Sequence, residues 1–523
     1  MKMILFFNLI IFFNVFIATI SSSNAYIPDA SLSVPKIIKR HGYPSETHIV
    51  DTKDGYLLEV HRIPHGKNIK QYRNFPVFLQ HGVVASSADW IINGPKKALA
   101  YQLADNGFDV WLGNSRGNTY SRTHKSLSPD SEEFWNFSFH EMGIYDLPAT
   151  IDYVLERTNR SQLYYIGHSM GSCMFFVMCS MRPEYNYKIR AQISLAPVAY
   201  VHHMTSVLNS LVPYATQIQK ASNWVSKGAF LPQNAASKLV NKYLCGDNAM
   251  NSALCKKYIV YKMFGEDSVQ FDMVNWLNTY IPTKCEIEQI QHIHLGCYLQ
   301  LLNPNTMYKL LLYLFFPGLL PIILGHNPAG TSVKTLIHFA QEITTKNFQQ
   351  FDFGIEKNLE VYNCSHPPKY NLSNVIAPIA FYYAKNDILA DPLDVVELYS
   401  RLPNRLGINL IKFDQFNHVD FLYSKNVTEM VYQSVMNTLF KAEFADWIPE
   451  IDNTTAFNVS SDYNQCYDER NARKTKNGFW QKITSFIKRK EVYPLKNYMV
   501  EDHEENVRSR HTIKNAWNQT HFE

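Results

Sequence analysis

Gly167-His168-Ser169-Met170-Gly171 is the segment of this chain that is most informative about its fold. An apolar run, 163–166, precedes it and a second one, 173–178, follows it, which is typical of a buried strand, a tight turn and a helix. The glycines flank the serine because no larger side chain fits beside so tightly turned a backbone. The alternative is a plain glycine-rich loop, and the two apolar runs argue against it. The turn is expected to lift the Ser169 hydroxyl clear of the sheet, where it can attack a carbonyl carbon.

Ser169 needs a base, because a serine hydroxyl is a weak nucleophile until its proton is removed. Such turns are usually followed along the chain by an acid and then by a histidine. An apolar run, 376–383, ends shortly before Asp387, and another, 408–413, ends shortly before His418. Asp387 is therefore the expected orienting acid and His418 the expected base. Neighbouring carboxyls remain alternatives to Asp387: Asp391, Asp394, Asp414 and Asp420.

A reaction at an ester carbonyl also needs N–H donors for the negative oxygen that develops. One donor is expected from the residue after the nucleophile, and the other from the loop after an early strand. The apolar run 75–79 is that strand, and Gln80-His81-Gly82-Val83 is its exit. The expected donors are the N–H groups of Met170 and Val83. Taken alone, His81-Gly82 can also be an ordinary turn.

A collinear series of short motifs runs from about residue 35 to about residue 440. Together the motifs resemble the acid lipase family, the gastric and lysosomal lipases of the α/β-hydrolase fold. The resemblance covers most of the chain and is highly specific as a set. The matching stretches are Gly42-Tyr43-Pro44, Asp54 to Val60 with Arg62-Ile63-Pro64, Leu79-Gln80-His81-Gly82, Trp111 to Asn118, Ser138-Phe139 with Glu141-Met142, Tyr145 to Ala149, His326 to Ser332, Asn386 to Pro392 and Asn417 to Phe421.

The resemblance implies an α/β fold with a mostly parallel central sheet, helices on both faces and an inserted, mainly helical cap. It also implies that Ser169, Asp387 and His418 form a catalytic triad, with no cofactor and no metal ion. Two positions depart from the family pattern: Met170 stands where Gln is usual, and Val83 where Leu is usual. Both contribute backbone N–H groups, so the changes are expected to alter rate or acyl-chain fit without abolishing the oxyanion hole.

Composition agrees with a large globular enzyme. Of 523 residues, 46% are hydrophobic and 18% are charged, so the chain can bury a large core. The net charge is only +4 and no basic cluster is interleaved with aromatic residues, which argues against a nucleic-acid partner. The sequence contains no metal-ligand spacing such as C-x-x-C or H-E-x-x-H.

The N-terminus is typical of a secretory signal. Lys2 precedes an apolar stretch, 4–20, and small residues at Ser23 and Ala25 predict cleavage before Tyr26. An uncleaved membrane anchor is the alternative, which the short stretch disfavours. The protein is therefore expected to be secreted or lysosomal. N-glycosylation acceptors support this route: Asn136, Asn159, Asn363, Asn371, Asn426, Asn453, Asn458 and Asn518.

Eight cysteines enter an oxidising compartment on this route. The resemblance implies a disulfide between Cys245 and Cys255 in the cap. Cys173 and Cys179 lie on the helix after the nucleophile and are expected to be buried thiols. The pairing of the other four cysteines, Cys285, Cys297, Cys364 and Cys466, is open. A bond between Cys285 and Cys297 is one option.

Hydrophobic patterning divides the chain into a core and an interrupting cap. Strand and helix signals continue to about residue 200 and include a buried strand at 189–198. The cap region then reads as helical and loop-like, and the sheet resumes at Ile376 and ends with the helix after His418. The expected parts are a signal peptide, 1–25, two core segments, 26–200 and 371–445, a cap, 201–370, and a polar, disordered extension, 446–523.

One stretch is not explained by the resemblance. Residues of about 273–318 are an insertion relative to the family pattern, and they lead into an apolar, proline-broken run, 310–324. Three interpretations stay open: a lipid-facing lid, buried cap core, or a translated intron. Near the C-terminus, 479–490 has apolar residues at helical spacing among basic ones. This pattern indicates either a helix on an anionic membrane surface or a loose helix in a solvated tail.

These features indicate a secreted or lysosomal serine ester hydrolase that cleaves acyl esters of neutral lipids, such as triacylglycerols or cholesteryl esters, at a lipid–water interface. Contact with a membrane or lipid droplet is expected to be peripheral, and the oligomeric state is open. The alternatives are a short-chain carboxylesterase and a non-catalytic lipid-binding relative, and the complete triad disfavours the second. The preferred ester and the pH optimum are also open.

Overall fold

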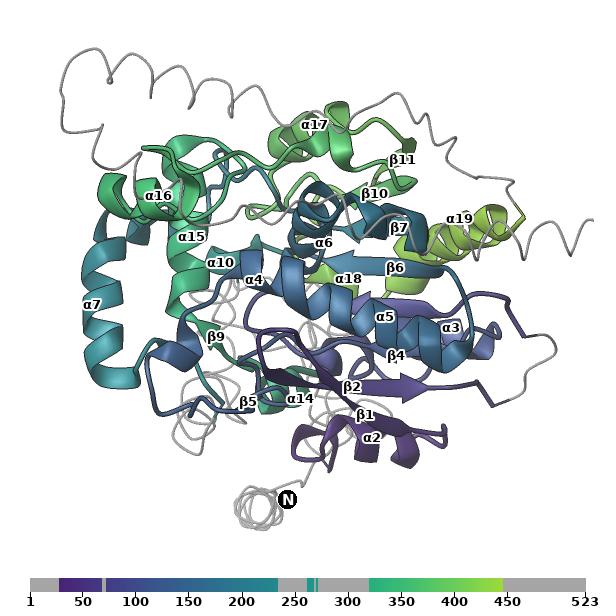
Figure 1. Ribbon diagram of the computed structural model, residues 1–523. Helices are drawn as coiled ribbons and strands as arrows, with labels where there is room; N and C mark the ends of the chain where they lie inside the picture. Colours follow the sequence, from purple (N-terminus) through teal and green to yellow (C-terminus); the bar gives the residue numbers. More distant parts are fainter. Residues whose placement is uncertain (1–27, 68–71, 234–260, 268–269, 271–318, 445–523) are drawn as a thin grey trace, which may run out of the picture. The chain divides into compact units, whose positions relative to one another are not determined.

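The computed structural model describes residues 28–67, 72–233, 261–267, 270 and 319–444. The main strands are β1 (Glu46–Asp51), β2 (Tyr56–Ile63), β3 (Val77–Gln80), β4 (Val110–Leu112), β5 (Thr123–His124), β6 (Leu163–His168), β7 (Ile189–Leu195), β10 (Ile379–Tyr383) and β11 (Arg405–Leu410). They form one central sheet in the order β1-β2-β4-β3-β6-β7-β10-β11, with β5 paired to β2 (Figure 1).

The sheet is antiparallel at one edge and parallel elsewhere. β2 pairs antiparallel with β1, β4 and β5, whereas the ladder from β4 to β11 is parallel. β3 and β6 are buried along their whole length, as expected for parallel strands covered on both faces. β1 is largely exposed or half-buried, as is typical of an edge strand. The prediction of a mostly parallel central sheet is confirmed.

Crossover handedness explains which helices cover which face. The core helices are α2 (Val34–Arg40), α3 (Leu99–Asp105), α5 (Leu147–Thr158), α6 (Met170–Met181), α17 (Pro392–Ser400), α18 (Asp420–Tyr423) and α19 (Gln433–Glu443). The chain moves from β3 to β4 in one direction and from β6 to β7 in the other, so right-handed crossovers place α3 and α6 on opposite faces. The crossovers through α5 and α17 share the direction of the α6 crossover. Phe440 of α19 stacks on Phe108, which follows α3, so α19 covers the face of α3.

Short helical turns complete the core. They are η1 (Pro28–Ala30), η2 (Ser87–Trp90), η3 (Glu133–Trp135), α4 (Phe139–Glu141), η4 (Met142–Asp146), η5 (Pro183–Lys188), η8 (Leu372–Asn374) and η9 (Thr428–Tyr432). A capping box at Ser138 and Glu141 starts α4, because each side chain bonds a backbone N–H of the other's turn.

Between β7 and β10 the chain leaves the sheet. The elements there are η6 (Val207–Tyr214), α7 (Ala215–Ser226), α10 (Tyr261–Phe264), α14 (Leu319–His326), α15 (Val333–Thr345), α16 (Ile355–Tyr362) and an antiparallel pair, β8 (Ala229–Phe230) with β9 (Thr331–Ser332). In Figure 1, α7, α15 and α16 stand together at one end of the sheet. α7 and α15 pack around a small apolar cluster of their own, centred on Val333, Ile337 and Phe351.

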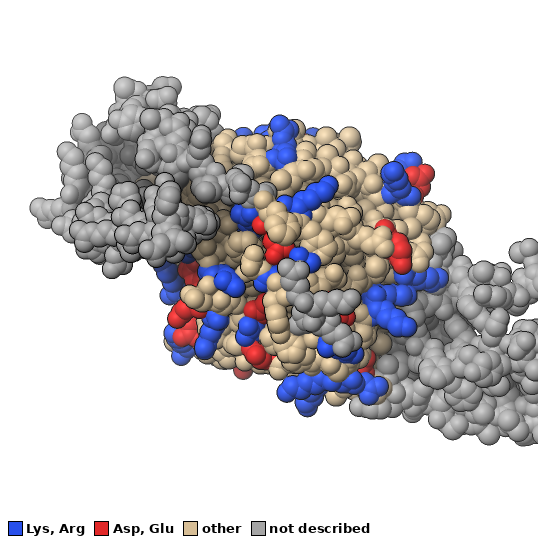
Figure 2. All heavy atoms as spheres, turned by 90° about the vertical axis from the view of Figure 1, so that its right-hand side faces the viewer, with Lys and Arg blue, Asp and Glu red and all other residues tan. Residues whose placement is uncertain are grey.

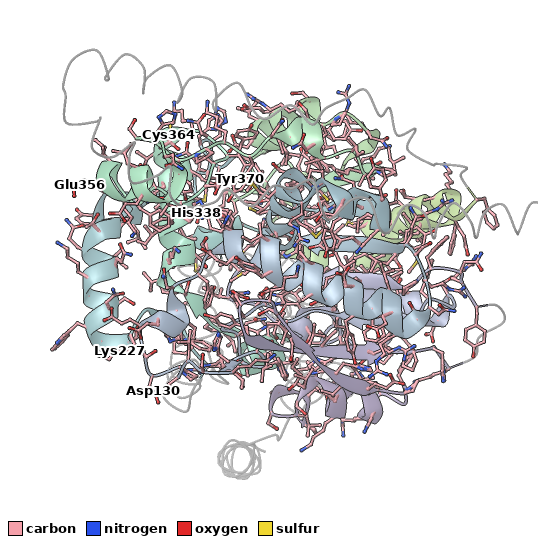
Figure 3. All side chains as sticks on the ribbon, in the orientation of Figure 1. Asp130, Lys227, His338, Glu356, Cys364 and Tyr370 are labelled. Carbon is pink, nitrogen blue, oxygen red and sulfur yellow. The ribbon has the colours of Figure 1, made fainter. Side chains whose placement is uncertain are left out.

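His338, labelled beside α15 in Figure 3, connects this helix to the core. Burial lowers the pKa of His338 to about 3, so the ring is neutral. Its Nε2–H donates to Gln349 O over 2.9 Å, and its Nδ1 accepts from the Ser138 hydroxyl over 3.0 Å. The ring also stacks on Phe139, with 4.0 Å between centroids. One neutral histidine therefore bonds two segments and packs against a third side chain.

One predicted strand is displaced in the structure. The apolar run 408–413 predicts a strand, but β11 spans Arg405–Leu410. β11 is the edge strand, and Leu406 and Leu410 are exposed, so apolar content does not mark its ends. Ile411 is buried just beyond the strand and extends the apolar run without extending the strand.

Several expectations lie outside the described residues. They are the signal peptide, 1–25, the Cys245–Cys255 disulfide, Cys285, Cys297 and Cys466, the insertion at about 273–318, the acceptors Asn453, Asn458 and Asn518, and the extension, 446–523, with its segment 479–490. Of the run 310–324, residues from Leu319 onward lie in α14. Within the described ranges, no helix has the length and apolar character needed to cross a membrane. On the face drawn in Figure 2, Lys and Arg are interspersed with Asp and Glu.

Candidate active site

Ser169 occupies the turn between β6 and α6, at the carboxyl end of its strand. Its φ of 54° and ψ of −122° are strained for a residue with a side chain, and such strain is typical of functional turns. The Ser169 N–H donates to Leu195 O over 3.0 Å, which ties the turn to β7. The predicted strand, turn and helix are all present.

Packing requires the glycines around this turn. A Cβ on Gly171 would collide with the backbone of Gln80, and a Cβ on Gly167 would lie 2.7 Å from the backbone of Gly171. The start of α6 therefore packs directly against the end of β3. This close packing also brings the next loop to Ser169, since a Cβ on Gly82 would lie 3.2 Å from Ser169 Cβ.

His418 and Asp387 lie on the loops after β11 and β10 and are in direct contact. His418 Nδ1 is 2.8 Å from one carboxylate oxygen of Asp387 and 3.0 Å from the other. A carboxylate only accepts, so the proton is on Nδ1 and Nε2 keeps the lone pair that a base needs. The N–H groups of Leu389 and Ala390 donate to Asp387 Oδ1 over 3.0 and 2.8 Å, which holds the carboxylate in position.

His168 joins the turn of Ser169 to the loop of His418. Its Nε2–H donates to His418 O over 2.9 Å. Burial and then the neighbouring His418 lower the pKa of His168 to about 3, so the ring is neutral. Because His168 directly precedes Ser169, this bond keeps the turn of Ser169 and the loop of His418 together.

His81 orients the expected oxyanion loop. Burial lowers the pKa of His81 to about 4, so this ring is also neutral. The Ser115 N–H donates to Nε2 over 3.0 Å, which leaves the proton on Nδ1, and Nδ1–H donates to Gly82 O over 2.7 Å. Gly82 C=O and Val83 N–H belong to one planar peptide, so holding the carbonyl sets the direction of the N–H.

The two expected oxyanion donors are positioned by different means. Met170 is the first residue of α6, so its N–H has no acceptor within the helix and lies at the positive end of the helix dipole. The loop of Val83 is held from its far side, since Ala329 N–H donates to Val84 O over 2.6 Å. Val84 has a φ of 53°, which a β-branched residue adopts only under strain.

Residues 113–118 form a buried polar support beneath this loop. The Arg116 side chain is 1% exposed, and its Nε–H donates to Asp146 Oδ1 over 2.7 Å. Its Nη2–H donates to Asp54 Oδ1 over 2.9 Å, and the guanidinium lies 4.0 Å from the centre of the Tyr56 ring. The charge pairs therefore hold residues 113–118 in place, and the bond from Ser115 N–H to His81 connects them to the expected oxyanion loop.

A segment of the expected cap, 261–267, here called the cap segment, contacts both loops that carry Asp387 and His418. Asn417 Nδ2 donates to Gly265 O over 2.9 Å, and Asn386 Nδ2 donates to Glu266 O over 2.8 Å. Each asparagine directly precedes an expected triad residue. Gly265 has a φ of 105°, and a Cβ there would collide with Asn386 O. The cap segment therefore needs glycine at this position to pack so closely.

Two buried carboxyls, Asp267 of the cap segment and Asp420 of the loop of His418, lie together where these two segments pack. Burial, and then the adjacent Asp267, raise the pKa of Asp420 well above its usual range. Asp420 Oδ2 accepts from Asn417 N–H over 2.8 Å, and Asp267 Oδ1 accepts from Gln270 N–H over 2.6 Å. A protonated Asp420 can donate to Asp267, which lets the two carboxyls lie together without like-charge repulsion.

Comparison with known proteins identifies the family. Residues 34–94 match the family described as the partial alpha/beta-hydrolase lipase region, and residues 76–223 match the alpha/beta hydrolase fold. Lipase 1 of Drosophila melanogaster is 37% identical over 422 residues, which cover 79% of this chain and 81% of that protein. The gastric triacylglycerol lipases of Bos taurus and Homo sapiens are 38% and 36% identical, over 79% of this chain and 92% of each. This chain belongs to the acid lipase family. It is a carboxylic ester hydrolase of the α/β-hydrolase fold.

The carboxyls that compete with Asp387 in the lipase sequence have other partners. Asp391 caps α17 by accepting from Leu393 N–H over 2.9 Å. Asp394 bonds His203, Asp414 is exposed beside Lys385, and Asp420 is the loop carboxyl described above. Of the candidates, only Asp387 is in contact with His418 among the described residues.

Sequence reasoning missed the supporting groups of the lipase site. His168 and His81 stand inside the quoted motifs, but their bonds join segments far apart along the chain, so no local pattern reveals them. Asn386 and Asn417 have a usable signal, because each directly precedes an expected triad residue. The cap segment 261–267 has no local signal, since its role comes from packing against both loops.

The structure also describes five of the predicted glycosylation acceptors and three of the cysteines of the lipase. Four glycosylation acceptors are exposed, whereas Asn371 is half-buried and its side chain accepts from Ser373 N–H. Cys173 and Cys179 are buried free thiols, as expected. Cys364, labelled in Figure 3, forms a disulfide with a partner outside the described residues. The exposed acceptors are Asn136, Asn159, Asn363 and Asn426.

Proposed function

We propose that this lipase hydrolyses acyl esters of neutral lipids with Ser169 as nucleophile, His418 as general base and acid, and Asp387 as the residue that orients the imidazole. The observation that most supports the proposal is the double contact of His418 Nδ1 with the Asp387 carboxylate. The bond from His168, next to Ser169, to the His418 carbonyl supports it further.

In the proposed reaction, His418 Nε2 takes the hydroxyl proton of Ser169 while Oγ attacks the ester carbonyl carbon. The N–H groups of Met170 and Val83 donate to the carbonyl oxygen as it becomes negative, and one such donor is worth roughly 3–4 kcal/mol. His418 then protonates the leaving alcohol and an acyl-enzyme forms. Water attacks the acyl carbon with His418 again as base, which releases the fatty acid and restores Ser169.

An apolar surface on the cap elements supports a substrate held at a lipid–water interface. Trp224 and Val225 of α7 are 83% and 73% exposed, and Val207, Leu211 and Tyr214 of η6 are also exposed. Exposed apolar groups gathered in one region mark contact sites more often than scattered ones do. Two of the relatives are named gastric triacylglycerol lipases. Triacylglycerols or cholesteryl esters are the proposed substrates.

The proposed location is the secretory pathway, with the protein secreted or lysosomal. Exposed glycosylation acceptors and the disulfide of Cys364 support an oxidising compartment. The proposed division of the chain is a core of residues 26–200 and 371–445 and a cap of residues 201–370. Its support is that the main sheet strands described lie within the two core segments.

The test compares emulsified triacylglycerol and cholesteryl ester with a soluble short-chain ester. Wild type is expected to hydrolyse the emulsions efficiently. Rapid turnover of the soluble ester with negligible emulsion hydrolysis would instead identify a short-chain carboxylesterase. A Trp224→Ser/Val225→Ser variant is expected to lose emulsion activity tenfold or more, because about 100 Å² of apolar contact is worth roughly 2.5 kcal/mol. Its soluble-ester turnover should persist. Phe444→Ser, another exposed aromatic after α19, is the matched control and should leave both activities unchanged.

A further inference from the structure

A second cluster of polar side chains lies between the turn after β7 and α17. His202 and His203 occupy that turn, and Asp394 is in the first turn of α17. His203 Nδ1 is 2.7 Å from Asp394 Oδ1, and His202 Nδ1 is 3.3 Å from the same oxygen. One ligand atom from each residue lies within 4.8 Å of those of the other two. Two imidazoles and one carboxylate therefore converge on one point.

His202 Nδ1 is a buried nitrogen that no hydrogen bond from the described residues satisfies. A buried polar atom without such a bond destabilises the folded state, because it has lost its hydrogen bonds to water. A cation placed between His202 and Asp394 would accept the lone pair of this nitrogen. The unsatisfied nitrogen and the nearby carboxylate are therefore both suited to binding a cation.

The contacts that His202, His203 and Asp394 make with surrounding groups match those of metal sites that contain histidine. In such sites the second ring nitrogen usually faces a carboxylate, and the ligating carboxylate is itself hydrogen-bonded. His202 Nε2 is 3.6 Å from Glu397 Oε2, while Arg401 holds the other oxygen of Glu397 over 2.7 Å. The N–H of His203 donates to Asp394 Oδ2 over 2.9 Å.

We propose that His202, His203 and Asp394 bind one divalent transition-metal ion of the zinc class. Zn²⁺ bonds of about 2.0–2.2 Å hold tetrahedral ligands about 3.3 Å apart. The contact of His202 with Asp394 already has this separation, and His203, at 2.7 Å, would move slightly outward to admit the ion. Two imidazole ligands favour Zn²⁺ over Ca²⁺ and Mg²⁺, which take oxygen ligands. Water completes the coordination on the open side, where the His203 side chain is 42% exposed.

Such an ion would tie the turn after β7 to α17, close to the loop of the proposed acid. The N–H groups of Thr205 and Ser206 contact Ile388 O over 3.1 and 3.3 Å, and Ile388 directly follows Asp387. The ion takes no part in ester hydrolysis. Its role is to stabilise the folded protein, since a ligand that binds only the folded state raises the free energy of unfolding.

The test uses the full chain and Zn²⁺ alone as probe. Chelator-treated protein is dialysed against buffered Zn²⁺, and bound zinc is measured by mass spectrometry. Wild type is expected to hold one more ion per chain than a His202→Gln/His203→Gln variant. His65→Gln removes an exposed histidine elsewhere and should match wild type. Zinc should also raise the melting temperature of wild type but not of the double variant.

Two further variants separate binding from folding. Asp394→Asn keeps an oxygen that accepts from His203 N–H, so it should fold and lose zinc. Glu397→Gln keeps all three ligands and should weaken zinc affinity about 10–100-fold. Equal zinc content in wild type and in both ligand variants would overturn the site, as would zinc lost equally from His65→Gln. Unchanged affinity in Glu397→Gln would overturn the role given to that carboxylate.

Discussion

At the scale of single residues, the proposed reaction depends on one proton that moves between Ser169 and His418. Ser169→Ala removes the nucleophilic oxygen and leaves a side chain that fits the turn. We expect ester turnover to fall by several orders of magnitude, while the unfolding transition stays close to that of wild type. Labelling of wild type by an organophosphonate, followed by peptide mass analysis, should mark Ser169 and should disappear in His418→Ala. Substantial hydrolysis by folded Ser169→Ala would remove the nucleophile assignment.

The orienting carboxylate makes a second prediction at this scale. Asp387→Asn keeps the size of the side chain, but its amide can donate to His418 Nδ1 and so stabilise the wrong tautomer. We expect turnover to fall by something like 10⁴-fold with little change in substrate binding. The measurement is kcat and KM on a soluble ester. Asp391→Asn is the matched control, because asparagine also caps a helix and Asp391 only caps α17. If the control loses activity and Asp387→Asn does not, the acid is misassigned.

At the scale of secondary-structure elements, the sequence predicts the strands and helices that a short run of residues is enough to determine. The strand before Ser169 and the helix after it follow from apolar runs interrupted by glycine. Asp387 and His418 follow from their positions after strands. The ends of β11 did not follow, because an edge strand exposes apolar residues to solvent. The contacts of His168 and the cap segment 261–267 did not follow either, because they join segments distant along the chain.

The contacts of the cap segment 261–267 predict that Gly265, which lies outside the proposed triad, affects activity by holding the proposed acid and base in position. Gly265→Ala adds a methyl group that collides with Asn386 O, next to the proposed acid. We expect kcat to fall at least about tenfold, because small displacements of catalytic groups have large effects on rate. Gly354→Ala is the matched control: Gly354 also has a positive φ, 86°, but a Cβ there meets nothing within 4 Å.

Both glycine variants place alanine at a positive φ, a strained backbone conformation that costs about 1–3 kcal/mol of stability. Only Gly265→Ala should also lose activity on a soluble ester. Equal kcat in the two variants would show that the cap segment does not position the acid and base.

At the scale of the whole molecule, buried ionisable groups give the fold two opposing responses to pH. Burial raises the pKa of several carboxyls, so the folded state binds protons more tightly than the unfolded state and gains stability as pH falls. Burial lowers the pKa of several histidines, and these groups make the folded state less stable as pH falls. The carboxyls are Asp89, Asp146, Glu342 and Asp420, and the histidines are His61, His81, His140, His168 and His338.

Asp89 allows one of these responses to be isolated. Its Oδ1 accepts from Asn327 Nδ2 and from the Tyr423 hydroxyl over 2.8 and 2.7 Å, so it joins η2, the segment before β9 and α18. Burial raises its pKa to about 6, whereas an unfolded Asp has a pKa of about 3.9. The stability from its protonation is therefore fully present below about pH 4 and is lost as pH rises through 6. Asp89→Asn can still accept both bonds but cannot ionise.

We therefore expect Asp89→Asn to gain stability relative to wild type as pH rises from about 4 to 7, by about 1–3 kcal/mol. Equilibrium unfolding in urea across this range measures the difference.

For His338→Gln, the stability difference from wild type should change with pH in the opposite direction, because the pKa of His338 is lowered to about 3 from an unfolded value of about 6.5. Wild type loses the stability due to His338 as pH falls below 6.5. The free energy of unfolding of His338→Gln should therefore rise relative to that of wild type as pH falls. A pH-independent difference for Asp89→Asn would mean that its carboxyl titrates alike in both states, and buried Asp89 would then not contribute to the pH response of the fold.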